Sequence, residues 1–187
     1  MLQFAISIFI IILNYGTAIS ANEYFRSVAT GNWNSNSTWQ MSTDGGGTWF
    51  AATSTPTETS GPITIQSPNT VTVTVSVNAD QMVVNSGGTV SINAAINLTI
   101  LNGGGDDLVL NSGGTISGSG ILQTQGTGVS MDIRLGSSFT IPLKINTGTA
   151  SFYNTDYPNP AIFNGTITVD AGATFTVTAG GYFVRAN

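Results

Sequence analysis

Apolar and polar residues alternate along most of the chain beyond residue 63, and clusters of small residues interrupt this alternation. The segment VVNSGGTVSI, which begins at Val83, returns almost unchanged as VLNSGGTISG from Val109 (109 − 83 = 26). Alternation at period two predicts strands with one buried side, and Asn-Ser-Gly-Gly predicts a tight corner. The repeated unit is therefore a strand, a corner and a second strand.

Less regular copies of this unit start near residues 65 and 169. A shortened copy lies between them, and in it we expect Ile133 and Leu135 to take the places that Leu108 and Leu110 have in the second central copy. One such unit cannot bury its apolar side alone, but stacked units share a continuous core. The sequence therefore predicts an all-β protein in which residues 63–187 form a parallel β-helix (β-solenoid).

Residues 1–21 have a different pattern. An apolar run from Phe4 to Leu13 is followed by small residues, which is typical of a cleaved signal peptide. The run is shorter than the roughly 20 residues of a membrane-spanning helix. We expect residues 1–21 to be a signal peptide and the rest of the chain to be secreted or at the cell surface, without membrane insertion after cleavage. The alternative is a chain tethered to the membrane by this run.

Residues 22–62 contain all three tryptophans of the chain. Asp44-Gly45-Gly46, between Trp39 and Trp49, predicts a hairpin turn with aromatic residues on its arms. Residues 53–62 (TSTPTETSGP) lack apolar periodicity and predict a loop. Because the end of a solenoid must be covered, we interpret this region as a Trp-rich N-terminal cap.

The repeats become irregular near the C-terminus. Residues 153–163 (YNTDYPNPAIF) contain two prolines and three aromatic residues, and they predict a loop that protrudes from the stack. The final strand-like stretch, at residues 182–184, has no capping sequence after it. Since solenoids need polar caps, we expect the chain to be the front part of a longer protein.

Composition excludes several classes of function. The chain has 4 Lys and Arg against 9 Asp and Glu, a net charge of −5, and neither Cys nor His. Four scattered cations cannot form the basic patch that nucleic acid requires. The missing residue types exclude disulfides, thiolate chemistry, Cys/His zinc sites and histidine-based triads.

Three acidic residues recur at the repeat distance. Asp80, Asp106 and Asp132 are evenly spaced (106 − 80 = 26 and 132 − 106 = 26), so equal coils would align them as a column of carboxylates. Carboxylates from adjacent coils act in some polysaccharide-cleaving β-helix enzymes. The shortened copy moves Asp132 off the column, however, and Asp before a strand is ordinary turn chemistry. We therefore expect no catalysis.

One turn has the composition of a calcium loop. Gly103-Gly104-Gly105-Asp106-Asp107 is similar to the Gly-Asp turns of calcium-binding β-rolls, and it makes Asp106 and Asp107 the candidate metal ligands. The calcium-binding nonapeptide repeats in tandem, however, and this chain has one imperfect copy. A plain turn is the favoured interpretation, and calcium is the cofactor to test.

Aromatic side chains are the candidate sugar-binding residues. Trp33, Trp39 and Trp49 in the cap, and Tyr153 and Tyr157 in the predicted loop, have ring faces that suit the apolar face of a pyranose. For the tryptophans, a cap over the solenoid end is the favoured interpretation. The tyrosines are the better candidates for contact with a polysaccharide or a cell-surface glycan.

Threonines at period two form two ladders, Thr70-Thr72-Thr74 and Thr174-Thr176-Thr178. Regular arrays of threonine can bind ice or glycans. Threonine is also favoured on the exposed side of any strand, and these arrays do not recur in every predicted coil. The sequence alone therefore favours the strand preference.

Four stretches of the first part of the chain carry a resemblance to known proteins: YFRSVATGNW at 24–33, STW at 37–39, DGGGTW at 44–49, and the run from Ile63 through Val90. With these residues the chain, to about Gly120, resembles the opening of large secreted and surface proteins of bacteria that use type IX secretion. It is also similar in style to G8-type domains. The resemblance implies an adhesin-like, right-handed, single-stranded parallel β-helix, and it identifies no catalytic residue. The sorting domain that usually ends such proteins is missing from this sequence.

These observations predict an extracellular structural or adhesive β-helix segment of a bacterial surface or secreted protein, without catalysis of its own. The alternative is a carbohydrate-binding module, or the non-catalytic front of a polysaccharide-degrading enzyme. Exposure of the aromatic residues on one face would favour the alternative, and their burial would argue against it.

Overall fold

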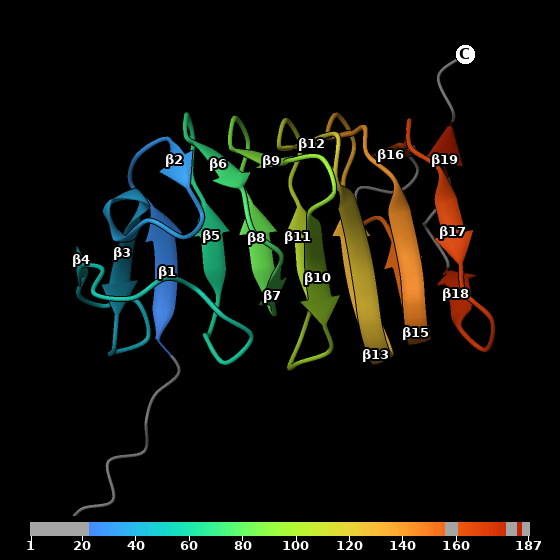
Figure 1. Cartoon of the computed structure of the whole chain (residues 1–187), viewed down its shortest axis with the longest axis horizontal. Coiled ribbons are helices and arrows are strands. Elements are labelled where there is room, and N and C mark those ends of the chain that lie inside the picture. Colours follow the sequence, from blue (N-terminus) through green and yellow to red (C-terminus); the bar gives the residue numbers. More distant parts are fainter. Residues whose placement is uncertain (1–22, 156–160, 179–182, 185–187) are drawn as a thin grey trace, which may run out of the picture.

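A computed structural model describes residues 23–155, 161–178 and 183–184. The predicted signal peptide and Tyr157 lie outside these residues. The described chain is almost entirely β-structure, and its parallel strands stack into a β-solenoid of about five turns. The strands follow one another along the long axis of the molecule, from the β1–β4 end to the β17–β19 end (Figure 1). The prediction of an all-β solenoid is confirmed.

The strands of each turn of the solenoid, or coil, lie on three faces, and the central coils contribute one strand to each face. The first face holds β1 (Tyr24–Ser27), β5 (Ile63–Ile65), β8 (Met82–Val84), β11 (Leu108–Leu110), the second halves of β13 (Ile121–Ile133) and β15 (Leu143–Tyr153), and β18 (Thr174–Val177). The second face holds β2 (Gly31–Asn32), β6 (Thr70–Val73), β9 (Thr89–Ile92), β12 (Thr115–Gly118) and β14 (Ser138–Phe139). The third face holds β7 (Val77–Ala79), β10 (Asn97–Leu101), the first halves of β13 and β15, and β17 (Ile167–Val169).

The strand register confirms the offset between the two central copies. Val83 pairs with Val109 in parallel strands on the first face, and Thr89 pairs with Thr115 on the second. The preceding coil is shorter, because Ile63 pairs with Met82 (82 − 63 = 19). Coil length therefore varies while the inward positions stay in register.

The predicted register of the shortened copy was wrong. Leu108 pairs with Met131 and Leu110 with Ile133 (131 − 108 = 23). Leu135 lies in the next corner and is 37% exposed. The chain passes from the third face to the first inside β13, through a local register shift, and it has no equivalent of the loop at 102–107. The coil is therefore shorter by three than the one before it (26 − 23 = 3).

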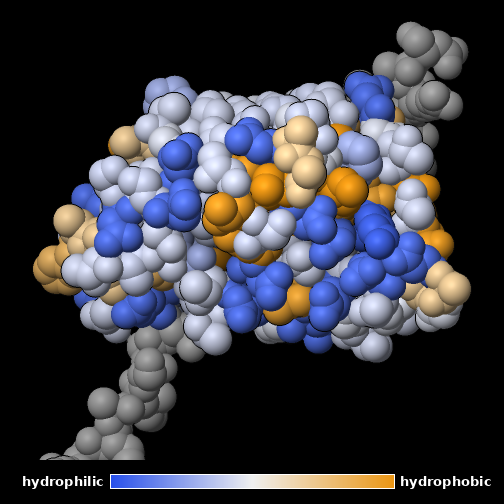
Figure 2. Space-filling model, in the orientation of Figure 1, coloured by the Kyte–Doolittle hydropathy of each residue, from blue (hydrophilic) through white to orange (hydrophobic). Residues whose placement is uncertain are grey.

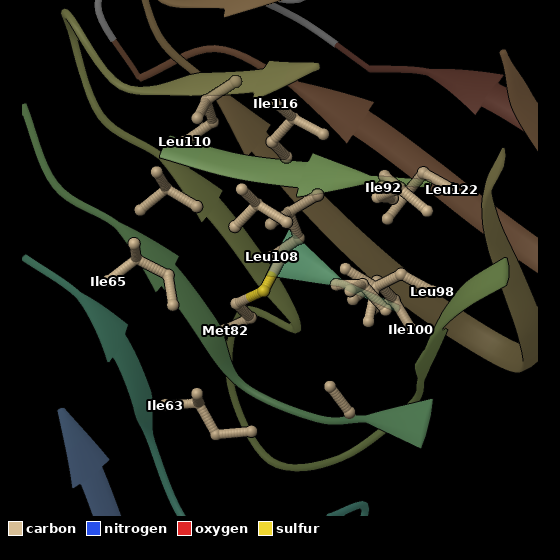
Figure 3. Packing of buried hydrophobic residues seen from close by; sticks show 14 of the residues in the cluster. Ile63, Ile65, Met82, Ile92, Leu98, Ile100, Leu108, Leu110, Ile116 and Leu122 are labelled. Atoms are coloured by element: carbon tan, nitrogen blue, oxygen red, sulfur yellow. The ribbon is translucent and has the colours of Figure 1, made fainter. Parts of the chain in front are cut away.

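The core is a continuous stack of aliphatic side chains inside the three faces. Met82, Val84, Leu108 and Leu110 are all fully buried, as predicted. Figure 3 shows side chains from successive coils pointing into one interior. Burial of each such side chain contributes roughly 1.5–3 kcal/mol to the stability of the fold. The stacked coils, rather than any single unit, therefore form the hydrophobic core.

The Asn-Ser-Gly-Gly corners need glycine for two different reasons. Gly87 has a φ of 76°, which lies in the left-handed region. Gly88 has an ordinary φ, but a Cβ atom there would lie 2.7 Å from the carbonyl oxygen of Ile65 in the preceding coil. The corner therefore passes too close to its neighbour to accept a side chain at the second position.

The N-terminal end is capped by a short helix and a hairpin. The 3₁₀ helix η1 (Asn36–Thr38) leads into β3 (Trp39–Ser42), which pairs antiparallel with β1 and with β4 (Phe50–Ala51). This confirms the predicted hairpin, and residues 53–62 form no strand, as predicted. Because β1 and β2 already pair in parallel with β5 and β6, the stack begins before the boundary predicted at Ile63.

The predicted loop at 153–163 is shorter than expected. Tyr153 is the last residue of β15, and Ala161–Ile162 forms β16, which pairs in parallel with β19 (Phe183–Val184). Phe163 is buried and bridges to Phe139, so it extends the second face. Both ends of the predicted loop are therefore β-structure, and residues 156–160 lie outside the described residues.

Inward positions are less buried in the last coil. Val169 pairs with Ile145, and Val177 with Phe152. Both valines are 44% exposed, whereas Ile145 and Phe152 are at most 1% exposed. Within the described residues, no further strand of the first or third face covers these positions.

Candidate functional site

The outward side of the second face carries a regular array of hydroxyl groups, which we call the hydroxyl face. Buried residues alternate with outward ones along β6, β9, β12 and β14, so every second side chain faces solvent. The parallel register then places these outward side chains in columns across four successive coils. The first column is Thr70, Thr89, Thr115 and Ser138, and the second is Thr72, Ser91, Ser117 and Thr140.

The geometry of the hydroxyl face is set by β-structure itself. Neighbouring strands lie about 4.8 Å apart, and side chains on one side of a strand repeat every ~6.6 Å. Each Thr or Ser hydroxyl can both donate and accept a hydrogen bond. The array is therefore a flat, periodic set of donors and acceptors, and it can match another periodic hydroxylated surface.

Threonine itself does not recur in every coil, as expected, but a hydroxyl group recurs in four successive coils. Serine replaces threonine at Ser91, Ser117 and Ser138, whereas in the first coil Asn32 takes the place aligned with Thr72. The other predicted ladder, at Thr174–Thr178, lies on the first face and is exposed. Reading Ser and Thr as one class at the correct coil offsets would have revealed the array.

A groove of about 370 Å³ lies beside the N-terminal end of the hydroxyl face. One wall is the loop at 55–58, and the other is the corner after β6 at 75–76 together with the first two residues of β7, Val77 and Asn78. Asn34 also lines it, and the hydroxyl of Thr74 donates a 3.4 Å hydrogen bond to the Asn34 Oδ1. The groove therefore adjoins the hydroxyl face through its Asn34 end.

Sequence reasoning missed the groove. Its two walls come from segments that are well separated in the sequence, one assigned to an irregular loop and the other to the repeats. Neither segment has a motif of its own. Trp33 is only 1% exposed, and it donates its indole N–H to the Pro56 carbonyl over 3.0 Å. This hydrogen bond holds the loop in place as one wall of the groove. Only the folded cap brings the two walls together.

Trp33 and Trp39 are not the sugar-binding residues that the sequence suggested as candidates. Both are 1% exposed, and their rings pack edge to face with centroids 5.2 Å apart. Trp39 donates its indole N–H to the carbonyl of Trp33 over 2.8 Å. Their faces are therefore inaccessible to a pyranose, and both residues form the core of the cap.

Trp49 is half-buried on the hairpin. The guanidinium carbon of Arg26 lies 4.3 Å from the centroid of its ring, and its indole N–H donates to the carbonyl of Gly46 over 3.0 Å. The Arg26 guanidinium is also held by two hydrogen bonds, of 2.9 and 2.7 Å, to Gln40 Oε1. A sugar stacking on that ring face would have to displace a guanidinium that is already anchored.

Of the two tyrosines predicted to contact a glycan, the structure describes only Tyr153. Tyr153 is half-buried, and its hydroxyl donates a hydrogen bond to Asp106 Oδ1. The pKa of the Tyr153 hydroxyl is raised, mainly because the hydroxyl is partly buried and to a smaller extent because it contacts the Asp106 carboxylate. Tyr153 therefore joins two coils of the first face. Tyr157 lies outside the described residues, and its role in glycan contact stays a prediction.

The candidate calcium turn closes a corner between coils. Asp107 is fully buried, and its Oδ1 accepts a 2.7 Å hydrogen bond from the backbone N–H of Gly103. Its Oδ2 accepts a second, also of 2.7 Å, from the backbone N–H of Ser130 in the next coil. In the described part of the chain, no three acidic side chains gather as metal ligands around Asp106, Asp107 or elsewhere. The geometry favours the interpretation as a plain turn.

Asp80 faces Asp107 at the same corner, and we call these two residues the acidic corner. Partial burial of Asp80, together with a hydrogen bond to Asp107 and the charge of that carboxylate, raises its pKa to about 6. Asp80 Oδ1 is buried and has no hydrogen-bond partner among the described residues. Raised carboxyl pKa values are common in catalytic acids, but paired structural carboxyls show them too.

Asp132 does not continue a column with Asp80 and Asp106. It leaves the column, as expected, but the register aligns it with Val109 rather than with Asp107, the partner that the predicted register implied. Its carboxylate accepts hydrogen bonds from Arg134 Nε over 2.7 Å and from the hydroxyl of Thr155 over 2.9 Å, and it is fully buried. Asp132 therefore anchors the chain after β15, and it has no open side for a substrate.

The surface is polar over most of the face seen in Figure 2, with the hydrophobic colour confined to a short band and scattered spots. Among the described residues, no helix has the length and apolar character needed to cross a membrane. A scan against protein-family models and searches of curated proteins and of solved structures found nothing that matches this chain. The hydroxyl face, the groove and the acidic corner are therefore the structural features from which a function can be inferred.

Proposed function

We propose that this chain is a structural and adhesive segment of a secreted or cell-surface bacterial protein, which contacts extracellular polysaccharide or cell-surface glycan and catalyses no reaction itself. The observation that carries this proposal is the hydroxyl face. Four successive coils present Thr or Ser at both outward positions, and the parallel register aligns them. A flat lattice of donors and acceptors suits a long polymer of hydroxylated rings better than it suits a small substrate.

Sequence features support the location. The apolar run at residues 4–13 is typical of a signal peptide, and the cap resembles the opening of type IX surface proteins. The low content of charged residues, 7%, also agrees with a role in contact rather than in chemistry. In the acidic corner, Asp107 is engaged by backbone donors of two coils, which supports a structural part for this carboxylate.

The test is binding of the purified protein to insoluble polysaccharides of several classes, namely cellulose, chitin, xylan and mannan, with and without calcium. A double variant, Thr89→Val with Thr115→Val, removes two adjacent hydroxyls and keeps the β-branched shape. Its matched control, Thr64→Val with Thr168→Val, changes outward threonines of the first and third faces. We expect about three- to tenfold weaker retention in the first variant and unchanged retention in the control.

Two results would overturn the proposal. One is a folded protein, by circular dichroism, that is retained by no polysaccharide in the panel. The other is equal weakening in the variant and its control, which would show that the hydroxyl face is not the contact surface. If retention of the protein on polysaccharide required calcium, Asp106 and Asp107 would again be candidate calcium ligands. Neither residue belongs to the hydroxyl face.

The second candidate is a carbohydrate-binding module, or the non-catalytic front of a polysaccharide-degrading enzyme. The groove favours this second candidate. A concave site of about 370 Å³ suits a short stretch of one polysaccharide chain better than it suits an extended polysaccharide surface. Release of reducing sugar from the same polysaccharides tests for catalysis. If wild-type protein releases sugar and Asp80→Asn or Asp106→Asn abolishes that release, the non-catalytic proposal is wrong.

A further inference from the structure

The groove beside the cap has walls that are held in place before any ligand arrives. The loop wall is fixed by the buried hydrogen bond from Trp33 to Pro56 and by a turn in which the Thr57 N–H donates to the Ser60 Oγ over 3.0 Å. The corner wall is tied to the next coil, because the Asn97 N–H donates to the Ser76 Oγ over 3.1 Å. Preorganised walls reduce the conformational entropy that a ligand must offset.

The lining combines four apolar residues with amide, hydroxyl and carboxylate groups. Val75 is 46% exposed, a large exposure for an aliphatic residue in the stack, and it lines the groove. Asn34, Asn78 and Glu58 also line it, and all three are exposed. Most ligand sites are predominantly apolar, whereas six of the ten residues lining this groove are polar, which suits a ligand rich in hydroxyl groups.

The charge of the lining selects among ligands. Glu58 is the only charged residue of the groove, and among the described residues it forms no ion pair. An unpaired carboxylate accepts hydrogen bonds from hydroxyl groups and repels an anion. A neutral ring with an apolar face and a rim of hydroxyls therefore matches Val75, the two amides and the carboxylate together.

We infer that this groove binds a short neutral segment of a glycan, with Val75 against a ring face and Asn78, Asn34 and Glu58 bonded to its hydroxyls. At the lower end of the ~300–1,000 Å³ range of ligand sites, the volume suits about one or two sugar rings. The inference rests on the proposed glycan contact and gives it a second, more selective site. Because Asn34 joins the groove to Thr74, a polymer lying along the hydroxyl face has the groove within reach.

The experiment uses soluble probes, so that it reports on the groove and not on the hydroxyl face. Hexasaccharides with neutral gluco, manno, galacto and N-acetylgluco units are titrated into the protein by calorimetry, beside oligogalacturonate of the same length. We expect binding of at least one neutral probe, with oligogalacturonate at least tenfold weaker. Asn78→Ala should weaken the neutral probe about five- to tenfold, whereas Asn102→Ala, an exposed asparagine remote from the groove, should leave it unchanged.

Glu58→Gln tests the charge argument separately. This variant keeps the shape of the side chain but removes its charge. The difference in affinity between the neutral probe and oligogalacturonate should therefore become smaller. The inference is overturned if no neutral probe binds, if Asn102→Ala weakens binding as much as Asn78→Ala, or if oligogalacturonate binds wild-type protein as well as the neutral probe does. Polysaccharide retention that is lost in the Thr89/Thr115 variant and kept in Asn78→Ala would leave the adhesive proposal standing without the groove.

Discussion

The carboxylate of Asp107 accepts a hydrogen bond from the backbone N–H of Ser130, one coil further along the solenoid, over 2.7 Å. A second bond of the same length comes from Gly103 within its own coil. This buried side chain therefore satisfies backbone donors of two coils at a corner where regular strand pairing is interrupted. It stabilises the stack at the corner where the sequence suggested a calcium turn.

Removal of this carboxylate should be strongly destabilising. In Asp107→Ala, two partly buried N–H groups lose their acceptor, and we expect the free energy of unfolding to fall by about 2–3 kcal/mol. Asp107→Asn keeps one acceptor oxygen and should lose less. Urea denaturation measures both. Asp170→Ala, which removes a partly exposed partner of Lys144, should change stability by less than ~1 kcal/mol, and a similar loss in both variants would contradict the argument.

The Asp80 carboxyl predicts how stability depends on pH. Its pKa in the folded protein, about 6, lies above the ordinary value of 3.8, so the folded state binds a proton more tightly than the unfolded state. The resulting stabilisation is complete below about pH 4 and is lost as the pH rises through about 6. Because Asp80 is only partly buried and solvent screens its charge, we expect a contribution of ~1 kcal/mol or less.

The matched variant for this prediction is Asp80→Asn, which cannot titrate. Thermal unfolding between pH 4 and pH 7 should show wild type losing stability relative to Asp80→Asn as the pH rises. A difference between the two proteins that stays constant over this range would show that Asp80 does not titrate there.

The cap predicts the behaviour of tryptophan fluorescence. Trp33 and Trp39 are 1% exposed, while Trp49 is half-buried at the surface. In Trp49→Phe, the remaining emission should be blue-shifted and almost unaffected by iodide, and it should become quenchable only in guanidinium. Polysaccharide should not alter it. Strong iodide quenching of folded Trp49→Phe would mean that the cap does not bury the other two rings.

Inward valines of the first face that differ in burial should tolerate the same substitution differently. Val84→Thr places a hydroxyl in a fully buried position and should cost about 1–3 kcal/mol. Val177→Thr makes the same change at an inward position that is 44% exposed, and it should cost less than ~0.5 kcal/mol. Chemical denaturation compares them. Equal losses would mean that the last coil is covered in solution as well as the central ones.

The alternation of apolar and small polar residues was enough to predict the class of fold. Period-two patterns and the repeated Asn-Ser-Gly-Gly corner allow few structures, because strands of this length bury their apolar side only by stacking. The hairpin between Trp39 and Trp49 was predictable for a similar reason, since Asp-Gly-Gly favours a turn whatever surrounds it. Local chemistry and periodicity determined these features.

Register, burial and the sites depended on tertiary structure. Leu135 and Met131 are both plausible inward residues in the sequence, and the choice between them depends on how β13 passes from one face to the next. The hydroxyl face appears only when coils of unequal length are aligned, because Ser91 and Ser117 then fall in one column with Thr72. The groove needs Trp33 buried against Pro56, a contact between residues far apart in the sequence.

The physical reason for this division is the range of the interactions involved. The conformation that each short segment prefers follows from its own residues, because strand alternation and turn chemistry act within a few residues. Which outward side chains become neighbours depends on the fold, because those distances are set by pairing between coils. The proposed glycan contacts at Thr89 and Asn78 both depend on neighbours that pairing between coils brings together.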